Sequence, residues 1–219
     1  MDRTTRAKLF REVDLYPVTC ERLSAGRSNL EVLEAAIAGG ARIIQLREKA
    51  CDMGDLYGLA VRFGELTAAA GMLLIINDHV DVALAAGADG VHLGQGDLPL
   101  PAARRIAPEL ILGASSHSRD QALRAQAEGA DYVNIGPIFP TGTKEGITRV
   151  LGPEAIAEIA AGLEIPFTVM GGINGGNIDR VLAAGARRIA LVTAVTRAPD
   201  MAAAVAALRA RNRAPRTGP

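Results

Sequence analysis

The chain repeats one short pattern of apolar and polar residues, in which an alanine-rich stretch ends near a glycine and an aliphatic segment follows. The four copies start 47, 42 and 56 residues apart and are Ala38–Leu46, Ala85–Leu93, Ala127–Ile135 and Ala183–Leu191. The glycine suits the left-handed position that ends a helix, and the aliphatic segment is typical of a strand. Because one helix and one strand need about 25 residues, each interval holds two such units. The pattern therefore predicts strands that alternate with helices.

Further apolar segments supply the remaining strands, at Val13–Thr19, Leu73–Ile76, Ile111–Ala114 and Pro166–Met170. The clearest amphipathic helices are predicted at Ser28–Ala38, Met53–Ala70, Arg119–Glu128, Pro153–Gly162, Ile178–Ala184 and Met201–Arg211. Their candidate N-caps include Asp52, Ser118 and Asn177. Eight strand–helix units favour an α/β fold with parallel strands, a single-domain (β/α)₈ TIM barrel, over an open sheet. We expect residues 1–12 to be an N-terminal extension, 13–211 the catalytic barrel domain, and 212–219 a flexible C-terminal tail.

The eighth position of the repeat predicts what faces the inside of the barrel. It is occupied by Gln45, His92, Asn134 and Ala190, and both neighbours are aliphatic in every copy. A two-residue period puts this position on the face opposite to the helix-packed one, so the four side chains form one inward layer. Buried polar groups without partners cost roughly 1–3 kcal/mol each. The layer therefore either satisfies itself through internal hydrogen bonds or faces a ligand at the mouth of the barrel.

Composition and charge exclude several classes of function. The 24 basic residues balance the 24 acidic ones, aromatic residues make up 3% of the chain, and tryptophan is absent. We therefore expect neither a nucleic acid nor a membrane surface as a partner. The N-terminus lacks the apolar stretch of a secretory signal, and the longest aliphatic run, Met72–Ile76, is too short to span a bilayer. With two cysteines, Cys20 and Cys51, expected as reduced thiols, we predict a cytoplasmic protein; a homo-oligomer stays open.

Polar residues follow the predicted strands at their carboxyl ends, where TIM barrels build their sites. Gln45, Arg47 and Lys49 lie on one side of the second strand and its extension, and Lys144 comes from a later loop. Cations from two loops converge only where they neutralise an anion, and phosphate oxygens suit both arginine and lysine. The alternative is a solvated charged rim.

Two aspartates, Asp78 and Asp97, follow neighbouring strands. Mg²⁺ prefers a few carboxylates together with phosphate oxygens, so a magnesium–pyrophosphate assembly is favoured over a proton-transfer pair. Each aspartate alone is equally consistent with a helix cap or a surface acid. None of the histidines has the spacing to another histidine or cysteine that a zinc site requires.

The loops after the last strands are suited to a monophosphate. Gly171–Gly172 and Val192–Thr193 follow strands seven and eight, a common position for phosphate against backbone N–H groups in this fold. A pair of glycines also marks any tight turn. Thr141 and Thr143 either bind a second phosphate or form a turn.

These segments, in this order, resemble thiamine-phosphate synthase (thiamine-phosphate pyrophosphorylase). The resemblance runs from Leu15 to about Arg197 and rests on LYPVT, QLREK, IINDHVDVALAAGADGVHLGQGD, GASSH, GPIFPTGTK, GGI and LVTAV. It implies a TIM-barrel transferase of thiamine biosynthesis. Such an enzyme joins 4-amino-2-methyl-5-hydroxymethylpyrimidine diphosphate to 4-methyl-5-(2-hydroxyethyl)thiazole phosphate, and it releases pyrophosphate in a dissociative substitution assisted by Mg²⁺.

The resemblance also implies roles for particular residues. The pyrimidine diphosphate would be bound by Gln45, Arg47, Lys49, Asn77, Ser115 and Lys144, among which Arg47, Lys49, Ser115 and Lys144 would act in catalysis. Asp78 and Asp97 would bind Mg²⁺. The thiazole phosphate would be bound by Thr141, Thr143, Gly172, Val192 and Thr193. Four residues depart from the family's frequent Asp, Gly, Ile and Ser, namely Cys20, Asn134, Met170 and Thr193.

Three other functions are compatible with the same barrel. A thiazole phosphate tautomerase would need a proton shuttle such as His117 but no diphosphate or magnesium site. A Schiff-base aldolase would use Lys144, which lies on a polar loop rather than in an apolar strand. A non-enzymatic relative would bind a phosphate ligand without forming product.

Overall fold

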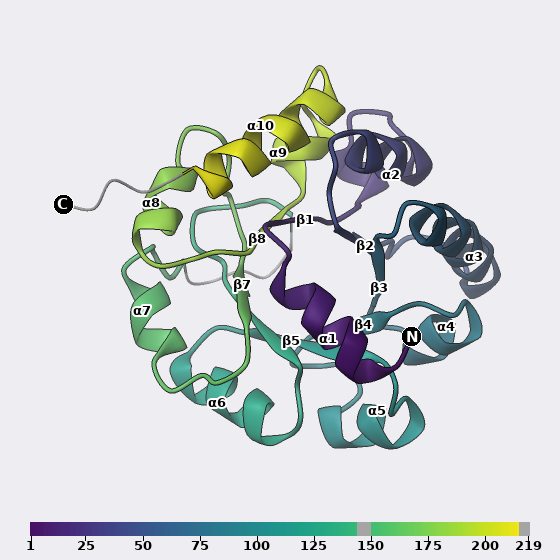
Figure 1. Cartoon of the computed structure of the whole chain (residues 1–219), viewed down its shortest axis with the longest axis horizontal. Coiled ribbons are helices and arrows are strands. Elements are labelled where there is room, and N and C mark those ends of the chain that lie inside the picture. The colour runs from purple at the N-terminus through teal and green to yellow at the C-terminus, as the bar shows by residue number, and fades with distance from the viewer. Residues whose placement is uncertain (144–149, 215–219) are drawn as a thin grey trace.

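The computed structural model describes residues 1–143 and 150–214 and shows parallel strands in a ring surrounded by helices (Figure 1). The eight strands of the described chain are β1 (Leu15–Pro17), β2 (Ile43–Leu46), β3 (Leu73–Asn77), β4 (Gly90–Leu93), β5 (Ile111–Ser116), β6 (Tyr132–Ile135), β7 (Phe167–Val169) and β8 (Ile189–Leu191). Each strand from β2 to β8 pairs with the next, and β8 pairs with β1. A bridge between Val18 and Gln45 joins β1 to β2. The predicted (β/α)₈ barrel is confirmed.

The helices cover the outside of this ring. They are α2 (Asn29–Ala38), α3 (Met53–Ala69), α4 (Val80–Ala85), α5 (Leu100–Ile106), α6 (Arg119–Ala127), α7 (Ala155–Ala160), α8 (Ile178–Ala183), α9 (Thr193–Thr196) and α10 (Met201–Arg213). Ser118 caps α6 as predicted, since its side chain accepts from the Gln121 N–H. Asp52 and Asn177 occupy N-cap positions without a side-chain bond to the helix. None of the described helices has the length and apolar character needed to cross a membrane.

Side chains alternate between two apolar clusters along the strands. Ile44 and Ile76 belong to the cluster between the strands and the helices. Ile43 and Ile75, one position earlier, belong to a smaller cluster inside the ring. Because the period of a strand is two residues, this alternation directs Gln45 inward, as the repeat predicts.

A helix that the sequence analysis did not predict closes one end of the barrel. Helix α1 (Arg3–Arg11) crosses the centre of the ring in Figure 1. Arg6 pairs with Asp89, and Arg3 pairs with Asp131, and both acids directly precede strands. The Phe10 ring stacks on the Tyr132 ring, with 4.1 Å between their centroids. Residues 1–12 therefore form the floor of the barrel.

Replacing Phe10 by alanine is expected to lower the free energy of unfolding by about 3–5 kcal/mol, because it leaves a cavity within the inner cluster, of which Phe10 is a member. Phe10 is 1% exposed, whereas Leu9 on the same helix is 41% exposed. Leu9→Ala is the matched control and should change stability by about 0.5 kcal/mol or less. Urea unfolding measures both, and equal losses would contradict a packed floor.

The last helix extends further than the sequence indicates. Asn212, which the sequence assigns to the tail, is buried and donates to the backbone oxygens of Asp14 and Arg187. Arg209 and Arg213 both pair with the Asp14 carboxylate. Residues 212 and 213 therefore continue α10, while 215–219 lie outside the described residues.

Candidate active site

A cavity of about 330 Å³ lies at the carboxyl ends of the strands, opposite the end that α1 closes. Among its lining residues are Gln45, Arg47, Lys49, Asn77, Asp78, Asp97, Ser115, Thr141, Thr143, Gly172, Val192 and Thr193. These are the site residues named from the sequence, apart from Lys144, which lies outside the described residues. Segments far apart in the sequence thus contribute to one cavity.

The inward layer predicted from the repeat lines the bottom of this cavity. All four members, Gln45, His92, Asn134 and Ala190, border it. The Gln45 amide donates to the Tyr16 hydroxyl at 2.9 Å, and the Thr168 hydroxyl donates to Asn134 Oδ1 at 2.8 Å. The layer is therefore hydrogen-bonded internally, and the same residues face the cavity, where a ligand would meet them.

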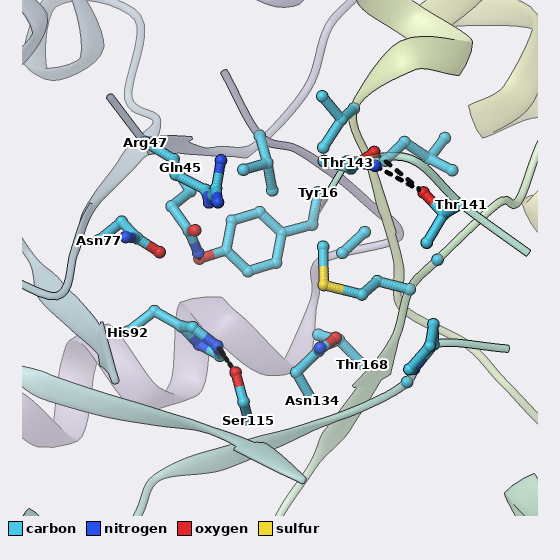
Figure 2. A pocket seen from close by; sticks show the side chains of 18 of the residues that line it. Tyr16, Gln45, Arg47, Asn77, His92, Ser115, Asn134, Thr141, Thr143 and Thr168 are labelled. Carbon is cyan, nitrogen blue, oxygen red and sulfur yellow. Dashed lines mark hydrogen bonds between the residues drawn. The ribbon is translucent and has the colours of Figure 1, made fainter. Parts of the chain in front are cut away.

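Sequence reasoning missed Tyr132, although a signal was present. Tyr132 lies two residues before Asn134 on β6, so the same two-residue period directs both inward. Its hydroxyl is 3.1 Å from His92 Nδ1, and His92 Nε2 is 3.0 Å from Ser115 Oγ (Figure 2 shows the second contact). The Ser115 hydroxyl is therefore positioned by His92, which is in turn in contact with Tyr132.

The loop after β2 carries Arg47 and Lys49 and is anchored by the residue between them. Glu48 accepts hydrogen bonds from the Asn29 side chain and from the backbone N–H groups of Glu21 and Lys49. Burial raises the pKa of Glu48, but these hydrogen bonds outweigh it and hold the pKa below its usual value. Glu48, which the sequence analysis did not single out, therefore fixes the loop while the side chains of Arg47 and Lys49 border the cavity.

The two aspartates lie beside one another. Lys49 Nζ is 2.8 Å from Asp78 Oδ2, and Asp97 Oδ2 accepts from the Gly94 N–H at 2.6 Å. Burial raises the pKa of Asp97, and the neighbouring Asp78 carboxyl raises it further. Neither aspartate is an N-cap, since those of α4 and α5 are His79 and Pro99.

This pair has the chemistry of an incomplete magnesium site. Within residues 1–143 and 150–214, no group of three or more histidine, cysteine or acidic side chains is arranged to hold a metal. Mg²⁺ needs few protein ligands because it keeps waters and accepts substrate phosphate oxygens. Two clustered carboxylates, of which one has a raised pKa, fit a cation that would relieve their repulsion.

The opposite side of the cavity is built from tight loops. Gly171 and Gly172 have φ angles of 100° and 63°, which residues other than glycine rarely adopt. The Thr141 hydroxyl donates to Thr143 Oγ1 at 3.0 Å. Thr193 begins α9, and the first N–H groups of a helix have no partner within it. Figure 2 shows Thr141 and Thr143 across the cavity from Asn77 and Arg47.

The four departures from the family pattern surround the same region. Asn134, Met170 and Thr193 line the cavity, and Asn134 Oδ1 accepts from the Thr168 hydroxyl. Cys20 is buried, with its sulfur 3.8 Å from Arg47 Nη1. All four departures therefore lie at the cavity or against a residue that lines it.

Comparison with known proteins gives a consistent result. The family model described as thiamine monophosphate synthase matches residues 15–195. The thiamine-phosphate synthase of Methanocella arvoryzae is 46% identical over 200 residues, which cover 91% of this chain and 94% of the relative. That of Chloroflexus aurantiacus is 46% identical over 196 residues, covering 90% and 91%. The structure of thiamine phosphate pyrophosphorylase from Pyrococcus furiosus aligns with a TM-score of 0.85 and 37% identity, covering 96% of this chain and all of that one.

More distant structures share the fold alone, such as a 3-hexulose-6-phosphate synthase at 20% identity and a TM-score of 0.68. The close matches span nearly the whole barrel and include the strand ends that line the cavity. This chain accordingly belongs to the thiamine monophosphate synthase family.

Proposed function

We propose that this chain condenses the pyrimidine diphosphate with the thiazole phosphate to give thiamine phosphate and pyrophosphate. The observation that carries the proposal is a shared cavity, which Arg47, Asp78 and Gly172 all border although they come from the ends of β2, β3 and β7. The high identity to thiamine-phosphate synthases over about nine-tenths of both chains supports the same reaction.

The diphosphate side would hold the leaving group. Arg47 offers a planar fork of N–H donors, and Lys49 offers a point charge. Asn77 and Gln45 supply neutral donors lower in the cavity, and Ser115 supplies a hydroxyl. Lys144, which lies outside the described residues, would add a further cation.

Asp78 and Asp97 would hold Mg²⁺. When bound, this ion supplies positive charge that offsets the negative charge of the diphosphate. Lys49 already offsets part of the charge on Asp78 through its ion pair. The two carboxylates would therefore bind the metal ion and would not transfer protons.

The chemistry requires little covalent help from the protein. The bond between the pyrimidine methylene carbon and the diphosphate oxygen breaks, and both electrons leave with pyrophosphate. The resulting methylene cation is stabilised by the ring, and the thiazole nitrogen attacks it. Arg47, Lys49 and Ser115 stabilise the charge that develops on the leaving oxygen, which is where fixed donors are most effective. Gly172 and Thr193 hold the thiazole phosphate on the other side of the cavity.

Incubation of the protein with both substrates and Mg²⁺, followed by mass analysis, is expected to yield thiamine phosphate. Isomerisation of the thiazole phosphate alone would indicate the tautomerase instead. Trapping of a keto acid by borohydride would indicate the aldolase, and binding without product would indicate a phosphate-ligand sensor. Any of these three results without thiamine phosphate contradicts the proposal.

Gly172→Ala is expected to weaken binding of the thiazole phosphate about tenfold or more, seen as a rise in its KM. A Cβ at this position would clash with the Pro140 backbone oxygen, and the φ of 63° adds strain. Gly175→Ala is the control, because a Cβ there meets nothing within 4 Å. An unchanged KM in Gly172→Ala would contradict a role of this loop in binding the thiazole phosphate.

A further inference from the structure

We propose that Tyr132, a buried β6 residue inside the barrel, is a positioning residue that sets the tautomer of His92 and thereby makes the Ser115 hydroxyl a donor toward the diphosphate. This inference rests on the proposed function, since it gives a direction to the hydrogen bond that Ser115 would make. It concerns a residue beneath the reacting groups rather than in contact with them.

Tyr132 is the centre of a continuous chain of polar contacts between two strand ends. The Gln45 amide nitrogen is 2.9 Å from the Tyr16 hydroxyl, which is 3.0 Å from the Tyr132 hydroxyl. The Tyr132 hydroxyl is 3.1 Å from His92 Nδ1. The chain ends at Ser115, whose Oγ is 3.0 Å from His92 Nε2. Two residues of the diphosphate side, Gln45 and Ser115, are thus linked through these buried polar contacts.

The proton order along this chain follows from what each group can do. The Gln45 amide nitrogen only donates, so the Tyr16 hydroxyl accepts from it. Tyr16 is 1% exposed, and the other group in contact with its hydroxyl among the described residues is Tyr132. Tyr16 therefore donates to Tyr132, because buried hydroxyl protons find acceptors.

The order continues through the histidine. Having accepted from Tyr16, the Tyr132 hydroxyl donates its own proton to His92 Nδ1. The imidazole then carries its proton on Nε2, which donates to Ser115 Oγ. The remaining proton of Ser115 is free to point into the cavity that Ser115 lines.

The direction of this last bond decides whether Ser115 attracts an anion. A hydroxyl that accepts from His92 donates its proton to a phosphate oxygen, and this is the favourable arrangement. In the opposite tautomer, Ser115 donates to His92 and turns lone pairs toward the diphosphate. Tyr132 thus acts on the ligand through the histidine and the serine.

The surroundings of Tyr132 keep this arrangement fixed. Its ring is 0% exposed and stacks on Phe10 at 4.1 Å and an interplanar angle of 24°. Burial raises the pKa of Tyr132 and of Tyr16, so both phenols keep their protons. The Tyr132 hydroxyl is therefore a neutral donor that is held in one orientation toward His92.

Tyr132→Phe tests the proposal because it removes the hydroxyl and retains the stacked ring. The first measurement is the ¹⁵N chemical shifts of the His92 ring without ligand, where we expect the Nε2–H tautomer in the wild-type protein. In Tyr132→Phe the shifts should move toward the Nδ1–H form. The control is Ser116→Ala, which removes a buried hydroxyl from β5, the strand that carries Ser115; this hydroxyl donates to the Asn134 backbone oxygen. This control should leave the shifts of His92 unchanged.

The second measurement is the affinity for inorganic pyrophosphate with Mg²⁺, by calorimetry. Tyr132→Phe should weaken binding roughly tenfold, the scale of one hydrogen bond to a charged group. In a Ser115→Ala background the same substitution should have no further effect, because Tyr132 acts on the ligand only through Ser115. Ser116→Ala should bind pyrophosphate as the wild type does.

An Nδ1–H tautomer in the wild-type protein would overturn the inference. So would an equal loss of pyrophosphate affinity from Tyr132→Phe with and without Ser115, because that result indicates a general structural role. A wild-type protein that forms no thiamine phosphate would contradict the proposed function, while the tautomer and the affinity cycle would still decide the role of Tyr132.

Discussion

Replacing Arg47 by alanine is expected to lower turnover about 10²–10³-fold, because a fixed donor is lost where negative charge develops on the leaving group. The fold should be little affected, since the backbone N–H of residue 47, which donates to Thr19 Oγ1 at 3.0 Å, is retained. Steady-state turnover with both substrates and a thermal melt on the same preparation check both parts.

Arg62→Ala is the matched control for this result. Arg62 is exposed, pairs with Glu65 one helical turn away on α3, and does not line the cavity. Its loss should leave turnover unchanged. Lys144→Ala should act in the same direction as Arg47→Ala. Unchanged turnover in both purified variants, Arg47→Ala and Lys144→Ala, would refute the assignment of the leaving-group site.

Replacing Asp78 by asparagine is expected to raise the Mg²⁺ concentration needed for half-maximal rate by about tenfold or more, because one of two carboxylate ligands is lost. Asp78 has a φ of 65°, in the left-handed region that asparagine also adopts. The substitution therefore removes the charge and preserves the backbone. A titration of the rate with Mg²⁺ measures the shift.

Asp81→Asn provides the comparison for Asp78→Asn. Asp81 lies three residues further along, is exposed, and does not border the cavity. The Mg²⁺ dependence of this variant should match that of the wild type. If the two variants require the same Mg²⁺ concentration, Asp78 is not a metal ligand.

The repeat predicted the inward layer because barrel geometry leaves little choice. A strand with aliphatic residues on both sides of a polar one must direct the polar residue away from the helices. Gln45, His92 and Asn134 therefore line the cavity as expected. The strand-end motifs were readable for the same reason, since all parallel strands end on one rim.

Features that depend on distant partners were not readable from the sequence. Helix α1 has a polar sequence, and it is positioned by hydrogen bonds to Asp89 and Asp131, which lie more than 80 positions away along the chain. Glu48 looks like a surface acid until its donors on η1 (Glu21–Leu23) and α2 are known. The pairing of Lys49 with Asp78 likewise arises only when β2 and β3 lie side by side.

One cavity is expected to hold the diphosphate, the metal and the thiazole phosphate together. A crystal structure of the protein with Mg²⁺, pyrophosphate and thiamine phosphate tests it directly. We expect pyrophosphate against Arg47 and Ser115, the metal on Asp78 and Asp97, and the phosphate of thiamine phosphate against Gly172. Ligands bound outside this cavity, or a metal on other residues, would contradict it.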